Sequence, residues 1–326
     1  MRSPDPTAKA HLLGDTVDDL LLAVIKEIQA NGEPVSPTKG ANRELTGLVL
    51  ELTNPRARLS RTETKGKPFS CLGELCWYLA KSNQLAFIEY YIRIYRKYAD
   101  GDVVFGGYGP RLFNWKGDQI RRAIDRLRTN PSSRKVVIQL FDANDMAEEH
   151  NDVPCTCTLQ FMIRRGKLQM FTHMRSNDAF IGLPHDIFCF TMLQEIVARA
   201  LSTEVGIYKH SVGSLHLYDK NVAEANQYIE EGFQSTTPMP PMPLGDPWPA
   251  IDLVLRAEST IRTAGTVDDA ILGKVGDYWA DLIRLLQVFR CKKLKEKNFA
   301  LLETLRNSMS SSVYSPFIDK VISDLS

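Results

Sequence analysis

The sequence lacks the features that mark several classes of protein. It has no run of about eighteen apolar residues, so no membrane-spanning helix is predicted. Residues 1–5 carry no apolar core of the kind found in secretory signals. With 40 Lys and Arg against 39 Asp and Glu, the net charge is +1, which argues against a surface for nucleic acid or anionic lipid. These absences predict a cytoplasmic protein with no nucleic-acid partner and no membrane partner.

Cysteine is also scarce. Six cysteines in 326 residues have no regular spacing, so a disulfide framework is not expected. Cys155 and Cys157 form a close pair, but no second Cys/His pair lies at zinc-site spacing, so no metal is predicted. The length suffices for one large domain or two smaller ones with a sizeable core.

Hydrophobic spacing predicts the elements. One helix is expected over 16–31, with Thr16 capping its start and Gly32 its end. Others are predicted over 71–81, 84–98, 117–128, 186–201 and 221–231, with strands over 48–50, 136–138, 158–164, 168–173 and 212–218. Residues 106–110 are predicted to form a loop, and 236–249 a linker or an ordered extended segment. From residue 250 the pattern is helical, with a break at Gly273 and Gly276. We expect an α+β domain over 16–249 and a helical C-terminal extension over 250–326 packed on it.

Two short segments carry groups suited to chemistry. Residues 152–161 place Cys155 directly after a proline, at the start of a predicted strand. Residues 175–186 hold an arginine, a hydroxyl, carboxylates and a Gly-Leu-Pro turn. A lone cysteine in a strand is usually a small buried hydrophobe, and such turns are common. In this order and spacing, however, a nucleophile and an anion-binding guanidinium favour an enzyme that attacks a nucleotide base.

These segments resemble the thymidylate synthase family, whose motifs read Pro-Cys-His and Arg-Ser-x-Asp-x-x-Leu-Gly-x-Pro-Phe-Asn. The resemblance covers about residues 38–249. Further matches lie at 74–79 (Glu-Leu-x-Trp-x-Leu), 94–100, 108–109, 130–135 and 216–218, and the match at Arg43 is weaker than the others. It implies a thymidylate synthase-like fold with a central mixed sheet and a homodimer with shared active sites. It also implies 5,10-methylenetetrahydrofolate as co-substrate, and no metal.

The resemblance also implies a role for individual residues. Cys155 would add to C6 of the pyrimidine, with Arg175 lowering the pKa of the thiol. Glu74 would move protons around the reacting carbon. The remaining matched positions are Arg43, Arg175 and Ser176 for the 5′-phosphate, Arg134 and Lys135 for the phosphate in the partner's site, His216 and Tyr218 for the ribose, and Glu74, Tyr95, Tyr98, Tyr108 and Asp178 for the folate.

The departures from the family pattern predict the reaction. Asp186 replaces the asparagine that reads uracil, and a carboxyl that shares a proton with N3 suits cytosine. Thr156 replaces a histidine near O4, an atom that cytosine lacks. Tyr95 and Tyr98 replace two tryptophans and leave space for water. The sequence is thus most similar to cytidylate 5-hydroxymethylases, with CMP slightly favoured over dCMP, in nucleoside-antibiotic or modified-nucleotide biosynthesis.

Two alternatives remain open. The first is a diverged thymidylate synthase or a uridylate hydroxymethylase, against which a carboxylate facing uracil O4 argues, because the contact is repulsive. The second is a non-catalytic nucleotide- or RNA-binding member of the family. The presence of Cys155 and of the phosphate arginines argues against it.

Overall fold

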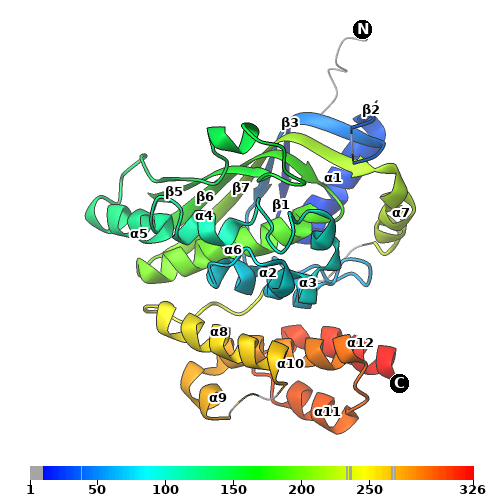
Figure 1. Cartoon of the computed structure of the whole chain (residues 1–326), viewed down its shortest axis with the longest axis vertical. Helices are drawn as coiled ribbons and strands as arrows, with labels where there is room; N and C mark the ends of the chain where they lie inside the picture. The colour runs from blue at the N-terminus through cyan, green and yellow to red at the C-terminus, as the bar shows by residue number, and fades with distance from the viewer. Residues whose placement is uncertain (1–9, 38, 233, 235–236, 266, 268) are drawn as a thin grey trace.

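The computed structural model describes residues 10–37, 39–232, 234, 237–265, 267 and 269–326. The described chain forms layers, with a sheet at the top of Figure 1, helices against it, and the C-terminal helices at the bottom. The sheet is mixed and the helices are numerous, so the predicted α+β fold is confirmed.

The sheet has seven strands among the described residues, in the order β1-β3-β7-β6-β5-β4, with β2 paired to β3. The strands are β1 (His11–Gly14), β2 (Glu33–Val35), β3 (Asn42–Leu52), β4 (Val137–Gln139), β5 (Thr156–Arg164), β6 (Lys167–Asp178) and β7 (Glu204–Tyr218). β6 and β7 are parallel, as are β1 and β3, and the other pairs are antiparallel. β1 and β2 were not predicted, because strands of three or four residues are too short to show alternation.

The helix α1 (Val17–Asn31) begins and ends where the sequence predicts. The Thr16 hydroxyl accepts from the Asp19 N–H, and the Asp19 carboxylate accepts from the Thr16 N–H, which is a capping box. At the other end the Gly32 N–H donates to the Ile28 carbonyl at 2.8 Å. The apolar stripe of α1 is buried against β1 and β3.

The helix α6 (Gly182–Ala200) is the long apolar helix that was predicted to be buried. Every residue from Ile187 to Arg199 is buried. α6 packs on β6 and β7, and on its other side against α2 (Pro68–Leu79). Since burial of apolar surface contributes roughly 25 cal/mol per Å², a helix enclosed on both sides fixes the two layers to each other. α6 starts four residues before its predicted start, so Asp186 lies within it.

The single helix predicted over 84–98 is wrong. The chain forms α3 (Leu85–Tyr91) and a 3₁₀ turn, η1 (Arg93–Lys97), separated by Ile92 in an extended conformation. Positions 91 and 95 would share one face of a continuous helix. The break instead lets the Tyr91 hydroxyl donate to Glu258 at 2.8 Å and the Tyr95 hydroxyl donate to Glu74.

The loop predicted over 106–110 is wrong in part, because Tyr108 begins the helix α4 (Tyr108–Phe113). Gly109, the second residue of α4, is packed closely against the backbone of Ser82. A Cβ at Gly109 would lie 2.5 Å from the carbonyl oxygen of Ser82. The next helix, α5 (Gln119–Thr129), matches its prediction within two residues.

The C-terminal region is helical, as predicted. The elements after β7 are α7 (Val222–Glu230), α8 (Trp248–Thr263), α9 (Asp269–Val275), α10 (Asp277–Leu294), α11 (Phe299–Asn307) and α12 (Ser315–Leu325). Gly276 breaks the chain with a φ of +72°, but Gly273 lies inside α9, so the break predicted there is wrong. α8 and α10 contact α2 (Figure 1). The division into 16–249 and 250–326 stays a prediction.

The described residues 237–247 form an ordered extended segment, one of the two predicted alternatives. The Met239 N–H donates to the Arg56 carbonyl at 2.9 Å, and the Met242 N–H donates to Glu195 at 3.0 Å. Glu195 is fully buried on α6 and also accepts from Arg58 and Arg56. Burial alone raises the pKa of Glu195, but the two guanidiniums and the Met242 N–H outweigh it and lower that pKa.

The substitution Glu195→Gln should destabilise the protein by about 3 kcal/mol, because it leaves the buried Arg58 guanidinium without its charge partner. Thermal and denaturant unfolding measure the loss. A carboxyl whose folded pKa lies below its ordinary value of 4.5 stabilises the fold above that pH. The difference between wild type and variant should therefore shrink as the pH falls through 4.5 and below.

Glu204→Gln is the matched control. Glu204 pairs with Arg56 and Arg199 in the same network, but its side chain is 56% exposed. Solvent screens such a pair, so the expected loss is below about 1 kcal/mol. Equal losses for the two variants would contradict the role given to burial.

Candidate active site

The predicted site residues gather at the ends of the central strands. Cys155 immediately precedes β5, and Asp178 ends β6. β6 and β7 are parallel, and Asp178 is in register with His216 near the end of β7. Parallel strands bring their carboxyl ends to one edge of a sheet. α6 follows β6 after a short turn, so Asp186 comes to the same edge.

Cys155 lies beside the Arg175 guanidinium. The Nη2 atom of Arg175 is 3.8 Å from the Cys155 Sγ atom. The same guanidinium donates to the carbonyls of Pro154 and Val153, both at 3.0 Å, and so fixes the segment that carries the thiol. This contact places the nucleophile and the anion-binding group predicted from the sequence next to each other.

Arg175 lowers the pKa of the Cys155 thiol, as the resemblance predicts. Burial and the charge of Asp152 act in the opposite direction and are stronger, so the pKa of Cys155 is raised to about 11. At neutral pH the thiol is protonated, and it must lose its proton before it attacks.

Glu74 is buried on α2, and two phenols donate to one of its carboxylate oxygens. The Tyr78 hydroxyl donates to Oε1 at 3.1 Å, and the Tyr95 hydroxyl donates to the same atom. Tyr78 was not predicted as a site residue. A signal was available, because Tyr78 follows Glu74 by four residues and so lies on the same face of the helix.

Asp186 shares this region with Glu74. Burial, and then the charge of Glu74, raise the pKa of Asp186 well above its ordinary value. The Nδ2 atom of Asn177 donates to Asp186 Oδ2 at 2.7 Å, while Asn177 Oδ1 is buried with no partner among the described residues. Asn177 was missed in the sequence, where it is the variable position of the Arg-Ser-x-Asp motif. The raised pKa favours the protonated form of Asp186, which offers one donor and one acceptor.

Thr156 and Tyr108 form one unit. The backbone N–H and the hydroxyl of Thr156 donate to the Tyr108 phenol oxygen, at 3.1 and 2.9 Å. Thr156 is fully buried, and Asp186 is among the charges that raise the Tyr108 pKa after burial itself. The residue that replaces the family histidine is therefore tied to a predicted folate-binding tyrosine.

Aromatic rings and a lysine also lie near Cys155. His216 and Tyr218 meet edge-on with centroids 4.9 Å apart. Lys39, which was not predicted, lies 4.4 Å above the Tyr98 ring and donates to Asp152 at 2.8 Å. It also acts on Cys155, whose pKa it lowers slightly against the effect of burial. A single lysine in a Pro- and Thr-rich segment gives no sequence signal.

One carboxylate oxygen of Asp178 stabilises the turn before α6. Its Oδ1 atom accepts from the N–H groups of Phe180 and Ile181, at 2.8 and 2.9 Å. Oδ2 has no hydrogen-bond partner within the described chain, so it is available to a pterin ring. The predicted folate contact is compatible with this geometry. Ser176 lies on the same strand, in register with Ser214.

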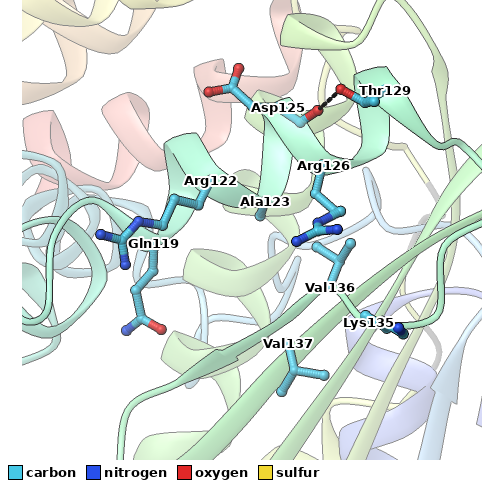
Figure 2. Close-up of a pocket in the computed structure, with 9 residues that line it drawn as sticks. All are labelled: Gln119, Arg122, Ala123, Asp125, Arg126, Thr129, Lys135, Val136 and Val137. Carbon is cyan, nitrogen blue, oxygen red and sulfur yellow. Dashed lines mark hydrogen bonds between the residues drawn. The ribbon is translucent and has the colours of Figure 1, made fainter.

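Three predicted phosphate residues lie away from this cluster. Arg43 donates to the Gly32 carbonyl at the end of α1, at 3.1 Å. Arg134 and Lys135 are exposed, just before the edge strand β4. Lys135 lines an open groove between α5 and β4, into which Arg126 extends (Figure 2). Exposure at an edge is compatible with contact to a second subunit, and the roles of all three stay predictions.

A partly buried thiol beside a guanidinium, with the buried carboxyl of Glu74 and the half-buried carboxyl of Asp186 in the same region, is typical of an enzyme that works through a covalent intermediate. The family model described as thymidylate synthase matches residues 22–251, more than half of the chain, and the protein belongs to that family. The family catalyses one-carbon transfer from methylenetetrahydrofolate to a pyrimidine nucleotide, and its members are typically dimers. The match extends the resemblance over 38–249 upstream into α1.

Within the described part of the chain, no group of three or more His, Cys, Asp or Glu side chains is arranged to hold a metal ion. None of the helices in the described ranges is long and apolar enough to cross a membrane.

Alkylation of Cys155 by iodoacetamide should be slow at pH 7 and rise about tenfold per pH unit toward pH 11, because the raised pKa leaves little thiolate at neutral pH. Mass spectrometry of the Cys155 peptide follows the reaction. Cys155→Ser is the control and should also lack turnover. A rate that reaches its plateau below pH 8 would contradict the raised pKa.

Proposed function

We propose that the protein is a cytidylate 5-hydroxymethyltransferase. It transfers the one-carbon unit of 5,10-methylenetetrahydrofolate to C5 of a cytosine nucleoside monophosphate, and water completes the hydroxymethyl group. CMP is slightly favoured over dCMP, and the setting is nucleoside-antibiotic or modified-nucleotide biosynthesis in the cytoplasm. The observation that carries the proposal is the half-buried Asp186, whose raised pKa favours the protonated carboxyl and whose Oδ2 accepts from Asn177.

The hydrogen-bond pattern of Asp186 supports cytosine. The Asn177 amide donates to Oδ2, so this oxygen acts as an acceptor and the proton is favoured on Oδ1. With Oδ2 toward C4 of the base and Oδ1 toward N3, the carboxyl accepts from the amino group and donates to N3. A neutral carboxyl stabilises charge that develops on the ring as the thiol adds, because its proton moves toward N3.

The same observation weakens one argument against uracil. The repulsion expected between a carboxylate and O4 disappears when Asp186 is neutral. A uridylate enzyme would need the opposite placement, with Oδ1 donating to O4 and Oδ2 accepting from the N3 proton. The choice between the bases therefore depends on which oxygen of Asp186 faces the C4 substituent and which faces N3.

The other residues take the roles that the family resemblance implies. Cys155 adds to C6, and Glu74 moves protons at the reacting carbon. The proposed binding residues are Arg43, Arg175 and Ser176 for the phosphate, with Arg134 and Lys135 of a second subunit, His216 and Tyr218 for the ribose, and Tyr95, Tyr98, Tyr108 and Asp178 for the folate. The enzyme is a homodimer with shared sites in this proposal.

Asp186→Asn should shift the preference of the enzyme from cytosine to uracil. An amide that reads N3 and the C4 substituent leaves buried polar groups unpaired against cytosine, at about 1–3 kcal/mol each, or roughly 5- to 150-fold. The measurement is kcat/KM for CMP, dCMP, UMP and dUMP with saturating methylenetetrahydrofolate. Product mass and the absorbance of dihydrofolate distinguish hydroxymethyl from methyl.

Two outcomes of this assay would count against the proposal. An unchanged ratio of cytosine to uracil activity would show that Asp186 does not read the base. Wild-type conversion of uridylate to a methylated product with formation of dihydrofolate would make the protein a thymidylate synthase. The four nucleotides side by side also decide between CMP and dCMP.

Mixing two inactive variants tests the shared site. Cys155→Ser and Arg134→Ala protomers should each be inactive or weak, yet their heterodimer has one site with both residues intact. Partial activity should return, approaching a quarter of wild type at equal mixing if half of the dimers are mixed and each has one working site. Absence of recovery, where labelled subunits demonstrably exchange, would place Arg134 in its own subunit's site or in none.

A further inference from the structure

The hydroxyls of Tyr78 and Tyr95 both donate to one oxygen of Glu74. The roles given above to Glu74 and Tyr95 do not account for this arrangement. Tyr78 reaches Oε1 from the same helix at 3.1 Å, and Tyr95 reaches it from η1. Burial first, and then the charge of Glu74, raise the pKa of each phenol well above its ordinary value. Both phenols therefore keep their protons and act only as donors toward the carboxylate.

Aromatic packing fixes both donors. The Tyr95 ring meets Trp77 edge-on at 5.3 Å, and the Tyr78 ring lies 5.2 Å from the Tyr108 ring. Side chains held in this way cannot swing their hydroxyls away without disturbing the core. Oε1 of Glu74 is thus occupied twice, whereas Oε2 has no hydrogen-bond partner among the residues described. The free oxygen belongs to the side chain whose charge raises the Asp186 pKa.

We propose that Tyr78 and Tyr95 are positioning residues, which hold Glu74 so that Oε2 accepts a proton from the water that completes the hydroxymethyl group. The inference rests on the proposed function, because that reaction alone requires water at this point. In this proposal Tyr95 has two roles. It leaves space for water where the family has a tryptophan, and its hydroxyl orients Glu74. One oxygen orients the carboxylate, and the other performs the chemistry.

The step balances in atoms and electrons. The water oxygen bonds to the exocyclic methylene carbon on C5, and one water proton passes to Glu74 Oε2. The electron pair of the exocyclic double bond moves into the ring and expels the Cys155 thiolate from C6. The products are the 5-hydroxymethyl nucleotide, a thiolate on Cys155 and a protonated Glu74. No oxidant or reductant takes part.

Tyr95→Phe and Tyr78→Phe test the role, since each removes a hydroxyl and retains the ring. A hydrogen bond to a charged group contributes about 1.5–3 kcal/mol, so kcat should fall roughly 10- to 100-fold for Tyr95→Phe. The KM for the nucleotide and the melting temperature should change little. Tyr90→Phe is the matched control, because its hydroxyl is buried on the adjacent α3 without a partner among the described residues. It should keep wild-type kcat.

A double-mutant cycle separates positioning from a purely structural role. In a Glu74→Gln background, where the base is absent, Tyr95→Phe should lower the single-turnover rate no further. If Tyr95→Phe lowers the rate by the same factor in both backgrounds, or raises KM instead of lowering kcat, the positioning role is wrong.

Product analysis of the wild type distinguishes failure of this inference from failure of the proposed function. A methylated product with dihydrofolate removes the water step and refutes both. A hydroxymethylated product with full kcat in both tyrosine variants leaves the proposed function standing and refutes the positioning role.

Discussion

The site is organised around two carboxyl groups that share one buried region. Glu74 on α2 and Asp186 on α6 lie close enough for the charge of one to raise the pKa of the other. Two carboxylates in such a place cannot both ionise without a large penalty. The surroundings of the two groups are unequal, since Glu74 receives two phenol donors, whereas Asp186 receives one amide donor and its pKa is raised.

Burial and neighbouring charges also set the pKa of the Cys155 thiol. Burial and Asp152 hold the Cys155 proton in place, while Arg175 and Lys39 act in the opposite direction. A bound nucleotide excludes water and adds its own charges, so substrate binding can change the pKa of the Cys155 thiol. The rigidity of the segment before Cys155, which Arg175 fixes through two carbonyls, keeps the distance to the guanidinium constant while the protonation state changes.

The C-terminal helices bear on the site through α3. Glu258 on α8 accepts from Tyr91 and from Arg262, and this buried contact holds the end of α3. The chain then extends at Ile92 and turns, which directs Tyr95 to Glu74. Glu258, which lies beyond the residues matched by the family model, thus helps to position the segment that carries Tyr95.

The sequence by itself determined the family, the mixed sheet, the caps of α1 and the burial of α6, because each depends on residues close in the chain or on a recurring pattern. It also indicated Cys155, Arg175, Glu74 and Asp186 by their motifs. The tertiary structure alone decided that the pKa values of Cys155 and Asp186 are raised. The contact of Asn177 with Asp186, the break at Ile92 and the raised pKa of Cys155 all depend on burial and on contacts between different elements, and no local pattern encodes the distance between such groups.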